Sequence, residues 1–301
     1  MGAGDPQLTG QKVLQGKRAI ITGASRGLGA AIAEAMWREG ADLLLVARSA
    51  GDLRSVRDHL IANRSGAQCV NVLAADLGGA SAPRAVMAEA RRLWTGLDVL
   101  VNSAGIIGPV GMLIDNDWSE WQRTINVNLL APVELCKLSV EWMLQGGVTG
   151  SIINISGGGA TGPRPYFSSY ATAKCALVRF SETLAAELAD AGIRVNCVAP
   201  GPMNTRMLQD TLEAGAERVG REEFEKITRF AGGAASDPRV AADLAVYLAS
   251  NNSCGITGKL VSAIWDPWQS LHEHVEELRT TDIYTLRRIV PQDRGRVWSH
   301  G

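Results

Sequence analysis

Tyr170 and Lys174 lie four positions apart in a stretch whose composition predicts a helix. This spacing places the two side chains on one helical face, about one turn apart. A cation beside a phenol favours the phenolate, so we expect Lys174 to lower the pKa of Tyr170. A tyrosine tuned in this way can exchange a proton with a substrate oxygen near neutral pH. The same pair also occurs on ordinary helices, where both side chains face solvent.

A glycine-rich turn, TGASRGLG at residues 22–29, follows the apolar run Arg18–Thr22 and precedes a stretch of helical composition. Strand, glycine turn and helix together are typical of a phosphate-binding loop. Gly23 permits a tight turn, and Gly27 and Gly29 let the backbone approach a ligand closely. The N–H groups at the start of the helix favour a pyrophosphate. The alternative is an ordinary turn that happens to be rich in glycine.

Two arginines indicate which dinucleotide such a loop would bind. Arg48 directly follows the expected strand Ala41–Ala47, and Arg26 lies in the glycine turn. An acidic residue at the end of this strand would bind a ribose 2′-hydroxyl, whereas an arginine accommodates a 2′-phosphate. The pair therefore favours NADP(H) over NAD(H). The alternative is that both arginines are merely solvated.

Apolar runs of strand composition alternate with helical stretches along the chain. This order predicts a parallel sheet with helices on both faces. Ligands of such sheets bind beyond the carboxyl ends of the strands, which is where the motifs of this chain lie. The expected strands are Arg18–Thr22, Ala41–Ala47, Cys69–Ala74, Val99–Val101, Ser151–Ile155, Ile193–Val198 and Lys259–Ile264.

Two stretches between the strands bear on a site. Asp117–Gln145 is expected as one long helix with a possible kink at Pro132, and it contains Asn128. Arg206–Ala235 is polar and ends in glycines, a composition typical of a mobile lid. The lid carries charges of both signs, so it selects neither acids nor bases. Arg164 and Arg206 favour a polar carbonyl or alcohol as the substrate.

The last segment, Trp265–Gly301, is rich in Trp, Arg, His and acidic residues. Leu271, Val275 and Leu278 are spaced i, i+4 and i+7, which forms one apolar helical stripe. Such a stripe must be buried. We therefore expect an ordered tail with a helix near residues 269–279, packed on the main domain or across a subunit boundary.

Composition excludes several classes of partner. The formal net charge of the 301 residues is −1, so we expect no nucleic acid and no anionic membrane as partner. The five cysteines are scattered without a Cys-x-x-Cys pair, which argues against a metal site or a disulfide framework. No apolar run approaches the length of a membrane span. These features predict a cytoplasmic protein.

The chain resembles the short-chain dehydrogenases/reductases over roughly residues 14–265. Seven motifs occur in family order and at family spacing: TGASRGLG (22–29), Asp76, NSAG (102–105), Asn128, Tyr170-x-x-x-Lys174, PGPMNT (200–205) and ITG (256–258). The resemblance implies a single α/β domain of Rossmann type, with a doubly wound parallel sheet and helices on both faces. It implies a lead-in at residues 1–16, an NADP-binding catalytic domain at 17–265 and a C-terminal extension at 266–301 that the family usually lacks.

The resemblance also implies roles for individual residues. Tyr170 would act as the acid/base in hydride transfer between NADP(H) and a small carbonyl or alcohol. Lys174 would hold the nicotinamide ribose, Asn128 would hold a water and Thr205 would bind the carboxamide. Ser156 completes the expected catalytic set. The implied cofactor-binding residues are Gly23, Ser25, Arg26, Gly27, Leu28, Gly29, Arg48, Asp76, Leu77, Asn102, Ala104, Gly105, Tyr170, Lys174, Pro200, Gly201 and Thr205.

The chain departs from the family pattern at the catalytic serine. Gly157 stands thirteen residues before Tyr170, where the family has that serine, and Ser156 stands fourteen before. Either Ser156 turns inward to replace it, or another group holds the substrate oxygen. Ser103 also replaces the usual second Asn of the NNAG motif, which should be a mild change. The glycine leaves open an NADP-binding sensor or scaffold with weakened catalysis. A third function also stays open, that of an epimerase or dehydratase that uses the cofactor transiently.

The surfaces of two helical stretches predict that the protein forms an oligomer. Asp117–Gln145 and Ser168–Ala191 carry apolar or small residues on more than one face, more than a sheet would cover. The family resemblance likewise suggests association through these helices. We therefore expect a homodimer or homotetramer.

Overall fold

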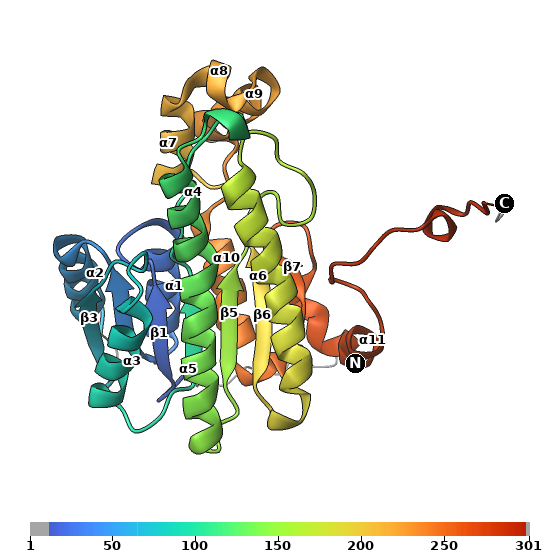
Figure 1. The fold of residues 1–301 in the computed structure, drawn as a ribbon. Coiled ribbons are helices and arrows are strands. Elements are labelled where there is room, and N and C mark those ends of the chain that lie inside the picture. The colour runs from blue at the N-terminus through green and yellow to red at the C-terminus, as the bar shows by residue number, and fades with distance from the viewer. Residues whose placement is uncertain (1–11, 65, 299–301) are drawn as a thin grey trace, which may run out of the picture.

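A computed structural model describes residues 12–64 and 66–298 and shows an α/β fold around one parallel sheet. The strand order β3-β2-β1-β4-β5-β6-β7 reverses direction between β1 and β4, as in doubly wound Rossmann-type sheets. The predicted fold class is thus confirmed (Figure 1). The strands are β1 (Arg18–Thr22), β2 (Asp42–Ala47), β3 (Val70–Ala74), β4 (Val99–Asn102), β5 (Ser151–Ile155), β6 (Arg194–Ala199) and β7 (Leu260–Ser262).

Helices cover both faces of the sheet, and alternation along each strand fills both cores. In β1, Ala19 and Ile21 face the core beneath the helices Gly27–Arg38 and Pro238–Ala249, while Ile20 faces the core beneath the helices Ala82–Leu93 and Ala131–Gln145. The central strands therefore read as unbroken apolar runs, as strands buried on both faces do. The α-helices on these faces are α1 (Gly27–Arg38), α2 (Ala50–Ala62), α3 (Ala82–Leu93), α5 (Ala131–Gln145), α6 (Ser168–Glu187) and α10 (Pro238–Ala249).

The long helix expected over Asp117–Gln145 is interrupted. It consists of α4 (Trp118–Ile125), a π-helical turn (Asn126–Leu130) and α5. Pro132 has no N–H to donate to the carbonyl of Asn128 four residues earlier, so an unbroken α-helical ladder is impossible here. The wider turn accommodates this missing bond. Turns of this kind often occur at functional sites, and Asn128 lies within this one.

Three short helices, α7 (Arg206–Glu213), α8 (Gly215–Val219) and α9 (Arg221–Arg229), follow strand β6. They correspond to the segment expected as a lid, and we refer to them together as the lid. Figure 1 shows them beyond the ends of the central strands, beside α4. The lid therefore lies at the edge of the sheet where the motifs are found.

The C-terminal tail packs against the sheet edge before it leaves the molecule. Its 3₁₀ helix (Trp268–His274) and α11 (Val275–Thr280) occupy the region where the sequence predicts one helix. Trp268, Leu271 and Leu278 are buried in the same core as α1 and α10.

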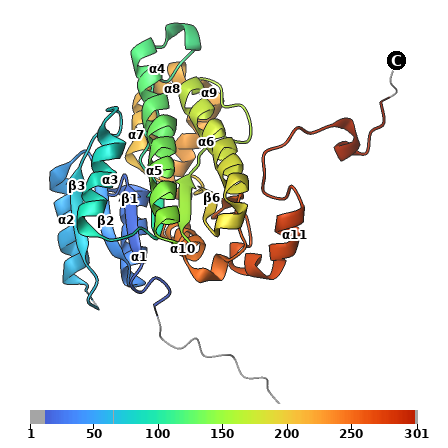
Figure 2. The same ribbon diagram turned by 60° about the horizontal axis from the view of Figure 1, so that its bottom comes forward.

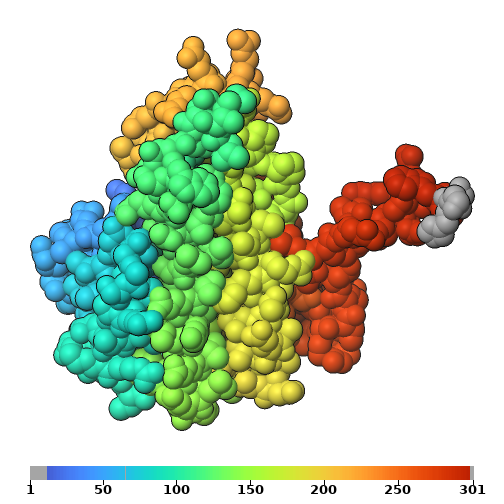
Figure 3. Space-filling view, in the orientation of Figure 1, coloured from blue at the N-terminus to red at the C-terminus, as the bar shows by residue number. Residues whose placement is uncertain are grey.

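Beyond α11, the tail is bonded to strand β7 and to its neighbour α6. The backbone N–H of Leu260 in β7 donates to the carbonyl of Tyr284, and Glu182 of α6 accepts from the N–H of Leu286. Figures 2 and 3 show the segment after these contacts extending away from the body. On this arm the side chains of Ile289, Val297 and Trp298 are exposed.

At the other end of the chain, residues 1–11 of the expected lead-in lie outside the described residues, as do residues 299–301 of the tail. Residues 12–16 form a turn, and within it Leu14 is fully buried in the core beneath α1. Among the described helices, none is both long enough and apolar enough to cross a membrane.

Candidate active site

A cavity of about 750 Å³ opens at the carboxyl ends of the strands. Its wall is built from the glycine turn after β1, the ends of β2 to β5, the helix α6 and the loop between β6 and α7. Most of the predicted cofactor and catalytic residues meet there. Those that line the cavity are Gly23, Ser25, Arg26, Gly27, Leu28, Gly29, Arg48, Asp76, Leu77, Ala104, Gly105, Ser156, Tyr170, Lys174, Pro200 and Thr205.

The glycine turn is held by close backbone contacts. Gly23 has φ +68°, and a Cβ on it would lie 2.8 Å from the backbone of Ala104. A Cβ on Gly29 would lie 2.2 Å from the carbonyl oxygen of Gly23. The hydroxyl of Thr22 accepts hydrogen bonds from the N–H groups of Ser103 and Ala104 at 3.0 and 3.1 Å. Only glycine fits at positions 23 and 29, and the turn is fixed against the end of β4.

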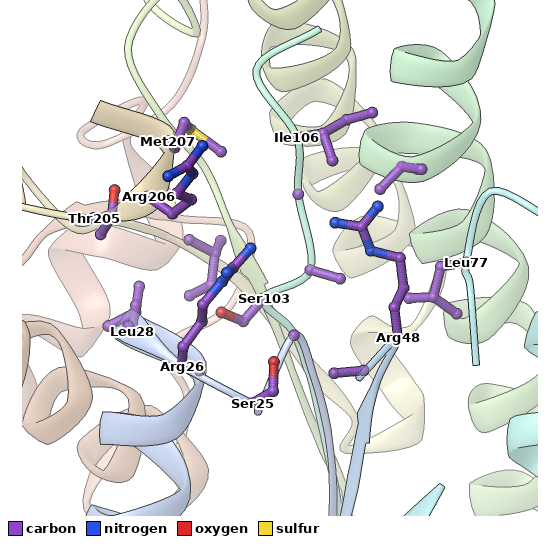
Figure 4. Close-up of a pocket in the computed structure, with 18 of the residues that line it drawn as sticks. Ser25, Arg26, Leu28, Arg48, Leu77, Ser103, Ile106, Thr205, Arg206 and Met207 are labelled. Atoms are coloured by element: carbon purple, nitrogen blue, oxygen red, sulfur yellow. The ribbon is translucent and has the colours of Figure 1, made fainter. Parts of the chain in front are cut away.

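Two cations reach the cavity from different elements. Figure 4 shows Arg26 extending from the glycine turn and Arg48 from the end of β2. Within residues 12–64 and 66–298, neither guanidinium forms an ion pair with a carboxylate. Ala47 stands at the strand end where a carboxylate would bind a ribose 2′-hydroxyl. Ser49, beside Arg48, adds a hydroxyl to the cavity lining.

Asp76 is engaged by neighbours other than a helix end. Arg123 donates to its carboxylate at 2.9 Å and the N–H of Gly78 donates at 3.0 Å. The hydrogen bond from Arg123 is the main reason that the pKa of Asp76 lies below its ordinary value. Ser81, not Asp76, stands at the N-cap of α3, so Asp76 does not cap that helix.

Tyr170 and Lys174 face one another on α6, and both are almost fully buried. Lys174 Nζ donates to the carbonyl of Ile155 at 2.7 Å and lies 5.8 Å from the centre of the Tyr170 ring. Burial lowers the pKa of Lys174 to about 8, and it raises the pKa of Tyr170. The cation that opposes this rise is Arg164, 5.9 Å from the ring. The lowering of the Tyr170 pKa by Lys174 that the sequence predicts is therefore wrong.

Position 157 controls where the Tyr170 hydroxyl can lie. A Cβ on Gly157 would lie 2.2 Å from Tyr170 Oη, so the hydroxyl occupies the space that a side chain at 157 would need. The neighbouring Ser156 lines the cavity, and its hydroxyl is buried without a hydrogen-bond partner among the described residues. A buried hydroxyl without a partner is costly, unless a ligand supplies one.

Asn128 ties the helix pair to the loop after β4. Its side chain accepts from the N–H of Ile106 at 2.9 Å and donates to the carbonyl of Ile106 at 2.8 Å. A Cβ on Gly105 would meet Asn128 Oδ1 at 3.3 Å and Lys174 Nζ at 3.8 Å. Asn128 thus lies behind the cavity wall, close to Lys174, rather than on the cavity surface.

The lid closes over Tyr170 with apolar side chains and one ion pair. Val219, Ile227 and Phe224 of the lid pack in one cluster with Phe167 and Tyr170. In the same region, Arg164 stacks over the Phe167 ring at 3.9 Å. Arg164 is held by Glu223 of α9 through bonds of 2.7 and 3.0 Å. The lid is thereby connected to the loop that precedes α6.

Comparison with known proteins shows the family. The family model for short chain dehydrogenases matches residues 17–215. The chain belongs to the short chain dehydrogenase family. It is 34% identical over 246 residues to 3beta-hydroxysteroid dehydrogenase 1 of Eggerthella lenta, covering 81% of this chain and 91% of that protein. It is 33% identical over 248 residues to glucose 1-dehydrogenase 2 of Bacillus subtilis, covering 82% and 93%.

The chain also superposes on a solved structure from Beutenbergia cavernae, described as an NAD(P)-dependent gluconate 5-dehydrogenase, with a TM-score of 0.73 at 29% identity. That structure has NADP bound at low occupancy. The match covers 84% of this chain and 97% of that one. As a member of this family, the chain is an oxidoreductase with a Rossmann-type nucleotide-binding fold.

Two predicted cofactor residues of this short chain dehydrogenase do not line the cavity. Asn102 is buried within β4, and its side chain donates to Asn154 of β5 at 2.8 Å, so it joins strands. Gly201, next to Pro200, is not in the cavity lining, and a Cβ on it would meet the side chain of Ile264 at 2.6 Å.

Other cavity residues were not predicted. They are Val46, Ala47, Ser49, Asp52, Ala75, Ser103, Ile106, Arg123, Val127, Ile155, Met203, Asn204, Met207 and Asp210. Of the two arginines expected to act on the substrate, Arg206 lines the cavity and Arg164 does not. Ser49 and Ser103 stand directly beside predicted residues, so adjacency to a motif at a strand end was a usable signal. Arg123 comes from α4 and had no comparable signal.

Proposed function

We propose that this oxidoreductase transfers a hydride between NADP(H) and a carbonyl or alcohol, with Tyr170 as the acid/base. One observation carries the proposal: Tyr170, Lys174 and Ser156 line the same cavity as the glycine turn and the two arginines. A proton-exchanging group and a dinucleotide site that share one cavity are what carbonyl reduction requires.

The cavity residues fit the cofactor. The glycine turn leaves no room for a Cβ at positions 23 and 29, so its backbone N–H groups can approach a pyrophosphate. Arg26, Arg48 and Ser49 would hold a 2′-phosphate, and Thr205 would contact the nicotinamide end. Lys174 would hold the nicotinamide ribose. The bound cofactor supplies or accepts the hydride at the substrate carbon.

The protein's own groups handle the proton. In the reductive direction Tyr170 donates its proton to the carbonyl oxygen, and burial keeps that proton in place at neutral pH. Ser156 donates a hydrogen bond to the same oxygen, which uses its otherwise unpaired hydroxyl. Arg164 stabilises the phenolate that remains. Asn128, fixed by Ile106, holds a water near Lys174 through which the proton is replaced.

The 2′-phosphate is the testable part of the cofactor proposal. Charge-assisted hydrogen bonds contribute about 1.5–3 kcal/mol each, so NADPH should bind at least roughly tenfold more tightly than NADH in calorimetry. Arg48→Ala should reduce that preference and leave NADH binding nearly unchanged. Arg54→Ala, an exposed arginine of α2 outside the cavity lining, is the matched control. Tighter binding of NADH by the wild-type protein would contradict the proposal.

Gly157 favours a second candidate, a cofactor-binding sensor or scaffold with weakened catalysis, because the family's serine is missing. An epimerase or dehydratase that returns the hydride to its product is a third. Net oxidation of NADPH by a carbonyl, followed by absorbance, is expected only for the proposed reductase. We also propose a cytoplasmic location, which suits the five free cysteines.

A further inference from the structure

One ion pair between the lid and the body lies beside the ring of Tyr170. Arg164, in the loop before α6, donates to the carboxylate of Glu223 of α9 from Nε at 3.0 Å and from Nη2 at 2.7 Å. Its guanidinium lies 3.9 Å from the centre of the Phe167 ring and 5.9 Å from that of Tyr170. Both charged side chains are about four-fifths buried. Because Arg164 does not line the cavity, the pair lies beside Tyr170 within the protein and outside the space left for a substrate.

The glycines that follow Ser156 bring this guanidinium close to the hydroxyl end of the ring. A Cβ on Gly157 would lie 2.2 Å from Tyr170 Oη, and a Cβ on the next residue, Gly158, would lie 3.7 Å from Arg164 Nη1. Two successive backbone positions thus contact the phenol and the guanidinium. A cation in such a place stabilises a phenolate, and its effect is larger in a buried site than in water.

The charges around Tyr170, among the residues that the structure describes, come from three elements. Lys174 belongs to the same helix, and Arg164 belongs to the loop before it. The lid contributes Glu223 and also Lys226, whose ammonium lies 3.7 Å from the second carboxylate oxygen of Glu223. The other side chains of the cluster that contains Tyr170 are apolar.

Of the two cations next to the ring, Arg164 is the one that acts when Tyr170 ionises. Burial raises the pKa of Tyr170, so its proton leaves only in the alkaline range. Lys174 lies 5.8 Å from the ring centre, but burial lowers its pKa to about 8, so it is uncharged in that range. A guanidinium keeps its charge there. Glu223 therefore decides how much of the Arg164 charge acts on the phenol.

We propose that Glu223 is a positioning residue for the acid/base Tyr170, on which it acts through Arg164. Its carboxylate holds the guanidinium beside the phenol and offsets the charge of that guanidinium. The packed lid thereby favours the protonated hydroxyl that donates in carbonyl reduction. The inference rests on the proposed role of Tyr170. It predicts that neutralising either partner of the ion pair shifts the ionisation of Tyr170, in opposite directions for the two partners.

The ionisation of Tyr170 can be followed in the free protein by NMR of the ζ-carbons of isotopically labelled tyrosines, with Tyr170→Phe to assign the resonance. Glu223→Gln leaves the charge of Arg164 without its offset, so Tyr170 should titrate on the order of one pH unit below the wild-type value. Arg164→Gln removes the cation and leaves the carboxylate, so Tyr170 should titrate above the wild-type value or stay protonated until the protein unfolds. Glu225→Gln, at an exposed position of α9, should leave the wild-type value unchanged.

Two further measurements separate an electrostatic role from a structural one. Arg164→Lys keeps a cation at this place and should restore most of the difference between Arg164→Gln and the wild type. Circular dichroism over the same pH range shows where each variant is folded. The inference is overturned if Tyr170 in folded Glu223→Gln titrates at or above the wild-type value, or if Glu223→Gln and Arg164→Gln shift it in the same direction.

The pH dependence of reduction distinguishes this inference from the proposed function. Reduction needs the protonated hydroxyl, so the alkaline limb of single-turnover NADPH oxidation should move to lower pH in Glu223→Gln and stay in place in Glu225→Gln. If the NMR shifts are as expected but Tyr170→Phe reduces a ketone at close to the wild-type rate, the role of Glu223 stands and that of Tyr170 fails. If Tyr170→Phe is inactive and Glu223→Gln shifts neither profile, the proposed function stands and this inference is overturned.

Discussion

The hydroxyl of Tyr170 occupies the space that a side chain on residue 157 would need. Gly157→Ala should therefore displace the proposed proton donor, and a displacement of about 1 Å can cost on the order of 10²-fold in rate. Gly158→Ala is the matched control, because its Cβ would meet Arg164 at an ordinary 3.7 Å. We expect single-turnover NADPH oxidation to fall sharply in the first variant and to change by no more than a few fold in the second.

Substitutions of Ser156 and Gly157 should change the rate of the chemical step in opposite ways for an active reductase and for a protein with weakened catalysis. If Ser156 holds the substrate oxygen, Ser156→Ala should slow the chemical step by roughly 10²–10³-fold, the range for losing one such donor. Gly157→Ser should then be harmful. A protein that has weakened catalysis would show the reverse, with a gain from Gly157→Ser and no effect of Ser156→Ala.

Lys174 should leave a signature in the pH dependence of stability. Its pKa is about 8 in the folded chain and about 10.5 ordinarily, so between these values the unfolded state binds more protons. Its contribution to the free energy of unfolding should therefore rise with pH across that window, by up to roughly 3 kcal/mol. Denaturant unfolding without cofactor should show this rise for the wild type relative to Lys174→Met. Parallel pH profiles would contradict the burial argument.

The residue types at this site were predictable, but their surroundings were not. The motifs at strand ends indicated the glycine turn, Arg48 and Tyr170, because parallel strands bring their carboxyl ends to one edge. The direction of the Tyr170 pKa depends on burial under the lid and on Arg164. Arg164 in turn depends on Glu223, 59 residues away in the chain. No local pattern encodes such a contact.

At the scale of elements, the C-terminal tail has a packed part and an exposed part, and the two meet where the chain leaves the sheet edge. Trp268, Leu271 and Leu278 are buried, and burial of a leucine contributes about 1.5–3 kcal/mol. Lys259 Nζ donates to the carbonyls of Thr281 and Ile283 at 3.1 and 2.9 Å. The segment up to Leu286 is therefore part of the fold, while the arm beyond it is exposed.

Two truncations test this division. Ending the chain after Asp266 should lower the melting temperature by several degrees, because the apolar side chains that pack against Trp268 and the edge of β7 become exposed. Ending it after Arg288 removes only the exposed arm and should leave the melting temperature unchanged. Equal melting temperatures for both truncated proteins and the full chain would show that the tail contributes nothing to stability.

Periodicity predicted the elements well where one local pattern decides them. The apolar stripe of the tail is buried as expected, but part of it forms a 3₁₀ helix rather than an α-helix. The break between α4 and α5 follows from the missing N–H of Pro132, where the sequence predicts only a possible kink. The strand-joining role of Asn102 was predictable from its place inside a buried strand. A polar side chain at such a place forms a hydrogen bond to a neighbouring strand more readily than to a ligand.

At the scale of the whole molecule, we expect a homodimer or homotetramer formed through α5 and α6. Leu130, beside α5, and Leu144, near its end, remain about half exposed, and Trp118 is more exposed still. Leu130→Glu would place a charge in such an interface and should shift the protein towards monomer in light scattering at micromolar concentration. Arg54→Glu on α2 is the control. A wild-type protein that is already monomeric would contradict this prediction.

The central claim is that a hydride passes between NADP(H) and a carbonyl carbon while Tyr170 supplies the proton. Its most direct measurement uses NADPH carrying deuterium at the transferable position, with a ketone that the wild-type protein reduces as the acceptor and mass spectrometry of the alcohol product. The wild-type protein should place one deuterium on the carbinol carbon. Tyr170→Phe should bind NADPH nearly as well and form almost no labelled alcohol, since only the proton donor is lost. Labelled product from Tyr170→Phe at close to the wild-type rate would contradict the assignment.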